Sequence, residues 1–288
     1  MNGLRYEAPG SVDEAVALLA GASGESRVLA GGSDLLVQLR SGLIAPELIV
    51  DVKKIDEMMT VSVNDGAYTI GAAVCSAQLR EDADLYAMWP GVIEAMDLVG
   101  STQVQGRASL GGNLCNASPA ADSVPAMIAA GAVCTVAGPN GRRDVPVEDI
   151  CTGPGETSLA KGEIVVTINL PKRAPRSGDA YLRFIPRTEM DIAVVGAGVC
   201  LTLDEGGTCT AARVALGAVA ARALLVQEAA DALIGSKVDD AAMANLDAAA
   251  QAACKPINDK RGTIEFRTKV AGVMARRAAA IALKRAGS

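Results

Sequence analysis

Residues 107–122 read Arg107-Ala108-Ser109-Leu110-Gly111-Gly112-Asn113-Leu114-Cys115-Asn116-Ala117-Ser118-Pro119-Ala120-Ala121-Asp122, and residues 30–35 read Ala30-Gly31-Gly32-Ser33-Asp34-Leu35. Each stretch places adjacent glycines, a hydroxyl residue and a short polar side chain beside an apolar segment. Paired glycines allow a backbone to adopt positive φ and to approach a ligand closely, because no Cβ intervenes. The exposed N–H groups of such a turn form a concave site for an anion. Two such loops predict one large anionic ligand bound from both sides, with a dinucleotide pyrophosphate as the obvious candidate.

The first glycine loop, residues 30–35, has two interpretations. Its backbone N–H groups either cradle a pyrophosphate or belong to a tight turn that leads into a capped helix. A Rossmann site is disfavoured, because the third glycine of the Gly-x-Gly-x-x-Gly pattern is missing and position 34 is acidic. We expect Asp34 to cap the following helix, with its carboxylate turned away from a phosphate.

The second glycine loop, residues 109–113, is harder to explain as an ordinary turn. Two glycines between apolar residues weaken any regular element, so some part of the structure must require a close backbone approach. The Ser109 hydroxyl and the Asn113 amide can both bond phosphate oxygens. This loop therefore carries most of the evidence for a ligand.

Composition limits the possible functions of this 288-residue chain. The net charge of −6 argues against a nucleic-acid partner, which requires a basic surface. There is no histidine, which excludes a histidine-based triad and a histidine-ligated metal. The seven cysteines have no Cys-x-x-Cys spacing, so we expect free thiols in a reducing compartment and no iron–sulfur cluster in this chain. The N-terminus lacks the apolar core of a signal peptide and no apolar run is long enough to span a bilayer, which predicts a cytoplasmic protein.

The chain is expected to fold as an α+β protein in two parts. We expect a first part with two lobes, residues 1–55 and 56–173, and a smaller C-terminal domain of antiparallel sheet plus helices, residues 179–288. In the first part we expect strands at 27–30, 48–52, 68–72, 132–137, 143–147 and 163–170, and helices at 12–20, 35–40, 92–99 and 124–130. In the second we expect strands at 181–185, 193–203 and 211–219, and helices at 223–234, 240–253 and 263–285.

The two glycine loops resemble those of the FAD-binding medium subunit of the molybdenum hydroxylases, the family of xanthine and carbon monoxide dehydrogenases. In that family an Ala-Gly-Gly-x-x-Leu loop and a Thr/Ser-x-Gly-Gly-Asn-x-x-x-Ala-x-Pro-x-x-Asp loop both wrap the FAD. The resemblance covers nearly the whole chain and implies an FAD-binding domain of the vanillyl-alcohol-oxidase and p-cresol-methylhydroxylase type. Other matching segments are Thr69-Ile70-Gly71-Ala72, the strand at 162–171, Tyr181-Leu182-Arg183-Phe184, Asp191-Ile192-Ala193 and the stretch from Arg261-Gly262 through Phe266-Arg267 to Arg276-Arg277.

The resemblance also implies which residues contact FAD. Val165 would contribute a backbone contact, Arg183 would replace the usual lysine, and Ile192 would cover the reactive face of the flavin. Asp122 would form a hydrogen bond to FAD. Read from the residues alone, Asp122 caps the helix that follows it, which is compatible with that bond, and Arg183 is a solvated strand residue. The full set of expected FAD contacts is Leu29, Ala30, Gly31, Gly32, Ser33, Asp34, Leu35, Ser109, Gly111, Gly112, Asn113, Ala117, Asp122, Val165, Arg183 and Ile192. No catalytic residue and no metal ligand is expected.

The implied function is electron transfer within a complex. A large molybdopterin-binding subunit would oxidise the substrate, and a small subunit with two [2Fe–2S] clusters would pass electrons to the flavin, in a dimer of heterotrimers. The flavin would then reduce an external acceptor. One alternative is a stand-alone FAD-dependent reductase of the same fold, such as the UDP-N-acetylenolpyruvylglucosamine reductase group, and another is a scaffold subunit that has lost its flavin.

Overall fold

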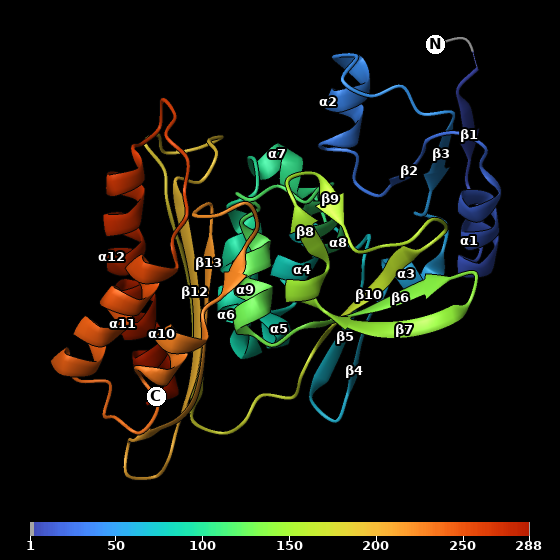
Figure 1. Cartoon of the computed structure of the whole chain (residues 1–288). Coiled ribbons are helices and arrows are strands. Elements are labelled where there is room, and N and C mark those ends of the chain that lie inside the picture. Colours follow the sequence, from blue (N-terminus) through green and yellow to red (C-terminus); the bar gives the residue numbers. More distant parts are fainter. Residues whose placement is uncertain (1–2, 288) are drawn as a thin grey trace.

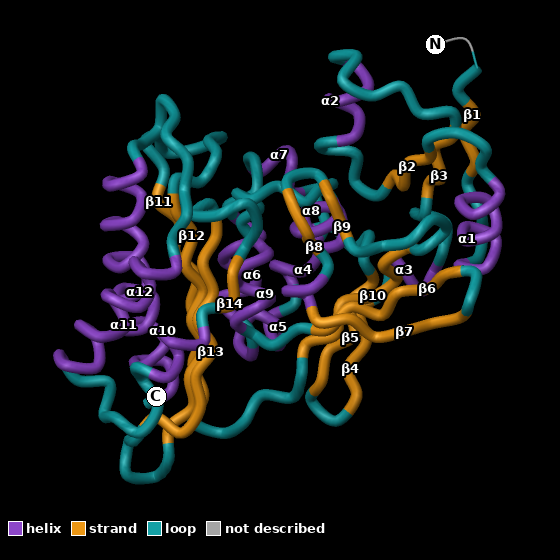
Figure 2. The backbone as a smooth tube through the Cα atoms, viewed as in Figure 1, coloured by secondary structure: helices purple, strands orange, loops and turns teal. Residues whose placement is uncertain are grey.

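The computed structural model describes residues 3–287. The N-terminal part of the chain forms a small parallel sheet (Figures 1 and 2). Its strands, in the order β1-β3-β2, are β1 (Arg5–Glu7), β3 (Leu48–Asp51) and β2 (Ser26–Leu29). The helix α1 (Val12–Gly21) starts where the Ser11 hydroxyl accepts a hydrogen bond from the Glu14 N–H. A second helix, α2 (Leu35–Arg40), follows the first glycine loop. We call this sheet with α1 and α2 the first lobe.

A five-stranded antiparallel sheet, together with the short helices that pack on it, including α8 (Leu110–Cys115), forms the second lobe. Its strands, in spatial order, are β4 (Val61–Asn64), β5 (Ala67–Gly71), β10 (Ile164–Leu170), β6 (Val133–Gly138) and β7 (Gly141–Pro146). The strands predicted at 68–72, 132–137, 143–147 and 163–170 are confirmed within two residues. A short 3₁₀ turn (Val147–Asp149) leads to a small hairpin of β8 (Cys151–Gly153) and β9 (Glu156–Thr157).

Short helices pack between this sheet and the C-terminal part of the chain, as Figure 1 shows. They are α3 (Asp56–Met59), α4 (Ser76–Glu81), α5 (Ala83–Met88), α6 (Pro90–Asp97), α7 (Thr102–Gln105), α8 (Leu110–Cys115) and α9 (Ser123–Ala129). Every residue of α9 is buried. This helix therefore lies in the core, where it contacts the C-terminal sheet on one side and α8 on the other.

The C-terminal part is an antiparallel sheet covered on its outer face by three helices (Figure 1). The strands are β11 (Ser177–Phe184), β12 (Val195–Leu203), β13 (Cys209–Gly217) and β14 (Leu224–Leu225), and the helices are α10 (Gln227–Asp231), α11 (Asp240–Ala253) and α12 (Ile264–Ala286). The predicted helix at 223–234 is wrong in its first turn. There the chain forms β14, and the Val226 N–H donates to the Val214 carbonyl oxygen at 2.8 Å. A sheet edge that needs a partner overrides the helix propensity of an alanine-rich segment.

Alanine brings α12 close to this sheet. Its buried face includes Ala271, Ala275, Ala278 and Ala282, spaced three or four residues apart. Opposite them lies Gly178 on β11, where any Cβ would overlap the Ala282 carbonyl oxygen. The core can thus be built from small side chains, in agreement with an aromatic content of only 2%. No helix in the described part of the chain combines the length and the apolar character that crossing a bilayer requires.

Candidate functional site

A cavity of about 350 Å³ lies between the two lobes, and both glycine loops contribute to its walls. Residues 157–165, from β9 to the start of β10, form a further wall. The structure thus brings together two loops that are some eighty positions apart in the sequence. The expected FAD contacts found in the wall are Ala30, Gly31, Gly32, Ser33, Asp34, Leu35, Ser109, Gly111, Gly112 and Val165.

The first glycine loop presents a row of backbone N–H groups that have no partner. Among residues 3–287, no acceptor receives a hydrogen bond from the N–H groups of residues 31–34. Gly32 has a φ of +78°, in the left-handed region that directs successive N–H groups toward one side. Unpaired N–H groups beside a cavity are costly unless a ligand or water accepts from them. This loop therefore has the properties of an anion site.

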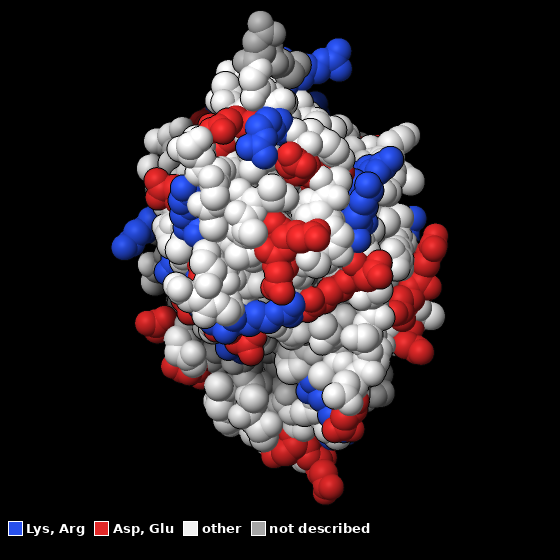
Figure 3. Space-filling view, turned by 90° about the vertical axis from the view of Figure 1, so that its right-hand side faces the viewer, with Lys and Arg blue, Asp and Glu red and all other residues white. Residues whose placement is uncertain are grey.

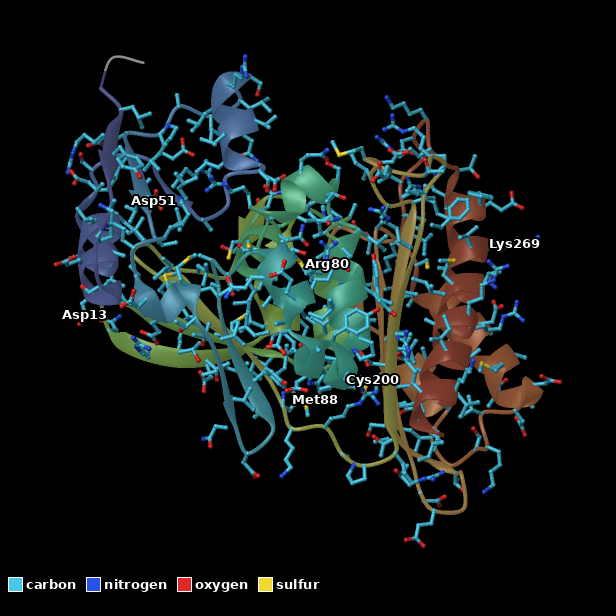
Figure 4. The ribbon with its side chains drawn as sticks, turned by 180° about the vertical axis from the view of Figure 1, so that it is seen from behind. Asp13, Asp51, Arg80, Met88, Cys200 and Lys269 are labelled. Carbon is cyan, nitrogen blue, oxygen red and sulfur yellow. The ribbon has the colours of Figure 1, made fainter. Side chains whose placement is uncertain are left out.

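Lys53 and Asp51 fix the beginning of this loop. The Lys53 ammonium donates to the Ala30 carbonyl oxygen at 3.0 Å and to the Asp51 carboxylate at 2.7 Å. Asp51 also accepts from the Tyr6 hydroxyl at 2.5 Å. Burial opposes ionisation of Asp51, but the hydrogen bonds from Lys53 and Tyr6 outweigh it and lower the pKa of this carboxyl. Figure 4 shows Asp51 in the first lobe, on the opposite side of the molecule from Lys269 on α12.

The second glycine loop forms the first part of a helix, α8, which the sequence did not predict. Ser109 is the N-cap of α8, and its hydroxyl accepts from the Gly112 N–H at 3.1 Å. The Gly111 N–H donates to the Ala72 carbonyl oxygen at 3.1 Å, and a Cβ on Gly111 would lie 2.6 Å from the Ala72 Cβ. The close approach that requires this glycine is therefore to the end of β5. The N–H groups of Gly111 and Gly112 therefore have partners within the protein, whereas those of residues 31–34 have none among the described residues.

Asp34 does not cap α2, contrary to expectation. Its backbone is already helical, with φ −99° and ψ −50°, so its carboxylate makes no hydrogen bond to the first turn. Instead it accepts from the Asn116 amide at 3.2 Å. Burial raises the pKa of Asp34, which weakens the repulsion between this carboxyl and an anion in the cavity.

Asp122 and Arg183 form a buried ion pair where the C-terminal sheet meets the second lobe. The Arg183 guanidinium donates to the Asp122 carboxylate at 2.8 Å and to the Leu98 carbonyl oxygen at 2.7 Å. The Tyr181 hydroxyl donates to the other oxygen of Asp122, also at 2.8 Å. Arg183 is therefore not a solvated strand residue, because its side chain is only 5% exposed. Nor does the Asp122 carboxylate cap α9, since the backbone of Asp122 is helical and its side chain makes no cap bond.

Burial dominates the titration of Asp122. It raises the pKa of this carboxyl to about 6, although Arg183 and Tyr181 both act in the opposite direction. The pair lies outside the cavity wall. It joins β11 to the segment that follows the second glycine loop, and so ties the two parts of the chain together.

The four remaining expected contacts also lie outside the cavity wall. Leu29 ends β2, and the Asn113 side-chain oxygen accepts from the Ser123 hydroxyl at 2.6 Å. Ala117 is buried and has a φ of +50°, an unusual value for a residue with a Cβ. Ile192 is 54% exposed.

Several residues of the wall were not predicted from the sequence. Gln38 and Asn116 lie next to predicted residues, and their polarity was the available signal. Thr157 ends β9, and Lys161 lies in the connection between β9 and β10, whose only sequence signal is the glycine that follows Lys161. A second cavity of about 120 Å³ adjoins the first at Ala160, Lys161 and Glu163.

Between residues 3 and 287, no three acidic or cysteine side chains are grouped so that they could hold a metal ion. The seven cysteines are free thiols. Figure 3 shows acidic and basic side chains interspersed over the face that lies on the right in Figure 1.

Two family models match the chain. The FAD-binding domain in molybdopterin dehydrogenase matches residues 2–173, and the carbon monoxide dehydrogenase flavoprotein C-terminal domain matches residues 180–282. The carbon monoxide dehydrogenase medium chain of Afipia carboxidovorans is 34% identical, over 98% of this chain and 97% of its own length.

Chains of solved structures have the same fold as this chain over nearly its whole length. A chain of the reconstituted carbon monoxide dehydrogenase from Oligotropha carboxidovorans superposes with a TM-score of 0.93 at 34% identity, covering 98% of both chains. A chain of quinoline 2-oxidoreductase from Pseudomonas putida 86 superposes with a TM-score of 0.90 at 30% identity, covering 99% of this chain and 98% of its own.

Proposed function

Because the chain belongs to the FAD-binding medium subunits of the molybdenum hydroxylases, we propose that it takes electrons from the iron–sulfur clusters of a partner subunit and passes them to an external acceptor. FAD is the cofactor of this family. When bound, FAD supplies the redox chemistry, and the protein supplies position and electrostatics.

The residues of the cavity fit FAD. The pyrophosphate is the anionic group of this cofactor, and residues 31–34 offer four consecutive N–H groups without partners among the described residues. Gly32 and Gly112 leave the wall without side chains at two points. We propose that the first glycine loop holds the pyrophosphate through these N–H groups and that α8 forms the opposite wall. The free N–H groups beside the cavity are the observation that carries this proposal.

We further propose that the FAD extends beyond the cavity toward the buried Asp122–Arg183 pair. Leu29, Asn113, Ala117 and Ile192 would then lie along or near the rest of the cofactor, with Val165 contributing a backbone contact. Arg183 would hold the C-terminal sheet against the second lobe, since one guanidinium nitrogen joins Asp122 to Leu98. In this proposal the chain divides into an FAD-binding domain, residues 1–173, and a C-terminal domain, residues 179–288.

The titratable side chains in the wall of the cavity include two carboxylates, Asp34 and Glu163, together with Lys161 and Cys115. The two carboxylates in its wall are engaged: Asp34 accepts from Asn116, and Glu163 pairs with Arg143 at 2.7 Å. The chain contains no histidine. The residues of this chain would therefore bind and orient a cofactor, while substrate oxidation takes place in a partner subunit.

The proposed partners are a large molybdopterin-binding subunit and a small subunit with two [2Fe–2S] clusters, in a dimer of heterotrimers. Co-expression of the chain with each candidate partner, followed by purification through a tag on this chain, tests the assembly. We expect molybdenum, iron and FAD to co-purify. Recovery of the flavoprotein alone, when both partners are present and folded, would contradict the proposal.

A further inference from the structure

The helix α2 is only weakly attached to the rest of the molecule. None of its residues is buried, and Figure 1 shows that it projects from the first lobe. Leu36, Val37 and Leu43 are 52%, 63% and 76% exposed, so apolar packing contributes little to its position. The first glycine loop, whose residues 31–34 carry the free N–H groups, nevertheless leads directly into α2. Whatever holds α2 in place therefore also positions the proposed pyrophosphate site.

Lys53 holds the start of the glycine loop at Ala30, but beyond that point one residue, Asn116, makes all the hydrogen bonds from residues 31–43 to other parts of the described chain. The Gln38 side-chain amide donates to the Asn116 oxygen at 3.1 Å, and the Asn116 amide donates to the Asp34 carboxylate at 3.2 Å. Within residues 3–287, no other hydrogen bond or ion pair joins residues 31–43 to a residue outside that segment. An amide suits this position because it accepts from one partner while it donates to the other.

The backbone of Asn116 is itself fixed. Asn116 is the C-cap of α8, and its N–H donates to the Gly112 carbonyl oxygen at 3.0 Å. The next residue, Ala117, adopts a φ of +50° and donates its N–H to the Leu114 carbonyl oxygen at 3.0 Å. This turn is of the kind that ends helices, usually at glycine. The second lobe thus presents the Asn116 side chain from a rigid base.

Asp34, Gln38 and Asn116 all contribute to the wall of the cavity. Their hydrogen bonds run from α8 in the second lobe to α2 in the first, across the gap in which the dinucleotide would lie. We propose that Asn116 is a latch: it keeps α2 and the first glycine loop closed against the second lobe and thereby sets the rate at which FAD leaves. This inference rests on the proposed function, because it takes FAD as the ligand. Asn116 is a positioning residue, since it acts through the segment that it holds.

The test compares FAD release from the full-length holoprotein and its Asn116→Ala variant. After dilution, the fluorescence of free FAD gives the dissociation rate. Loss of both hydrogen bonds should accelerate release about tenfold, which corresponds to about 1.4 kcal/mol. The control is Asn64→Asp, on an exposed residue at the end of β4, which should release FAD at the wild-type rate. The thermal unfolding midpoint should be almost unchanged, because Asn116 is a partly exposed surface residue.

A reciprocal exchange distinguishes a latch from a general effect of charge. Asn116→Asp places a carboxylate opposite Asp34, and the two like charges should accelerate release further. Adding Asp34→Asn to the same chain restores one amide and one carboxylate with their roles reversed. We expect the double variant to release FAD at close to the wild-type rate. If the double variant is as fast as Asn116→Asp alone, the hydrogen bond does not hold the segment.

The outcomes separate this inference from the proposed function. A folded wild-type chain that binds no FAD would contradict the proposed function. A wild-type chain that holds FAD, with an Asn116→Ala variant that releases it at the same rate, would overturn only the latch. If Asn116→Ala does not fold, Gln38→Ala breaks one of the two bonds from an accessible position and should accelerate release about threefold.

Discussion

Gly31 of the first glycine loop and Arg107, just before the second, are in direct backbone contact: any Cβ on Gly31 would overlap the Arg107 carbonyl oxygen. The glycine is therefore required by the contact between the two lobes, apart from any ligand. Gly112 differs, because a Cβ there would meet only the Ser109 hydroxyl oxygen, at 3.1 Å, and would otherwise project into open space beside the cavity. Gly31 is thus required by the contact between the two lobes, whereas Gly112 keeps the wall of the cavity free of a side chain.

The first prediction uses this difference. Gly31→Ala should lower the free energy of unfolding by about 1–3 kcal/mol, because the loops must move apart. Gly112→Ala should leave stability unchanged or raise it by up to about 1 kcal/mol, since alanine favours a helix over glycine, but it should weaken FAD binding by at least tenfold. Urea unfolding and FAD titration measure the two effects. Unchanged FAD affinity in Gly112→Ala would show that the cofactor does not approach α8.

The second prediction concerns the left-handed residue of the first loop. Gly32→Val forces a β-branched side chain into φ +78°, at a cost of roughly 1–2 kcal/mol. Its Cβ would also lie 3.0 Å from side-chain atoms of Leu29 and Leu36. The N–H groups of residues 31–34 should therefore lose their common orientation, and the purified protein should contain no flavin. A folded Gly32→Val variant with full FAD content, measured by absorbance, would contradict the anion site.

Local signals predicted most of the longer regular elements, whereas short ones such as β1, β4, α3, α4, α5 and α7 were not predicted. The helices at 35–40 and 240–253 were predicted with their observed limits from their apolar spacing, and Asp239 also caps the second of them. The strand β14 was missed, since only its pairing with β13 makes Leu224 and Leu225 extended. The helix α8 was also missed, because its glycines look unfavourable until Ala72 is placed against Gly111.

In the candidate site, too, some features could be predicted from local sequence and others depend on distant partners. The two glycine loops are continuous in sequence and could be identified from it. The partners of Asp34, Asp122 and Arg183 could not, since each comes from a segment about sixty or more positions away. Asp34 and Asp122 each precede a helix and were expected to cap it. Their carboxylates instead form hydrogen bonds with distant segments of the chain.

The third prediction is a dependence of stability on pH. In the folded protein the pKa of Asp122 is about 6, above its unperturbed value of 3.8. The folded state therefore holds this proton more tightly, so the contribution to stability is complete below about pH 4 and is lost as the pH rises to about 6. The loss should be on the order of 1–3 kcal/mol. Asp122→Asn, which retains an acceptor for Arg183, should remove this part of the pH dependence in urea unfolding. Parallel profiles for the two proteins would refute the assignment to Asp122.

The fourth prediction is that FAD is bound without a covalent bond. The chain has no histidine to carry a flavin linkage, and Cys115 is the cysteine that lines the cavity among the described residues. Acid precipitation should release all the yellow colour into the supernatant. If colour stays with the pellet in the wild type and not in Cys115→Ser, a thioether at this residue would be indicated instead.

The fifth prediction concerns the central claim, that this chain carries electrons and does not oxidise the substrate itself. The decisive measurement is the anaerobic absorbance of the flavin after addition of a substrate of the assembled complex, recorded for the FAD-loaded chain alone and for the complex with both partners. We predict that the flavin band of the isolated chain stays unchanged and that the band bleaches in the complex. Bleaching of the isolated chain by a purine, an aldehyde, an N-heterocycle or carbon monoxide would contradict the account.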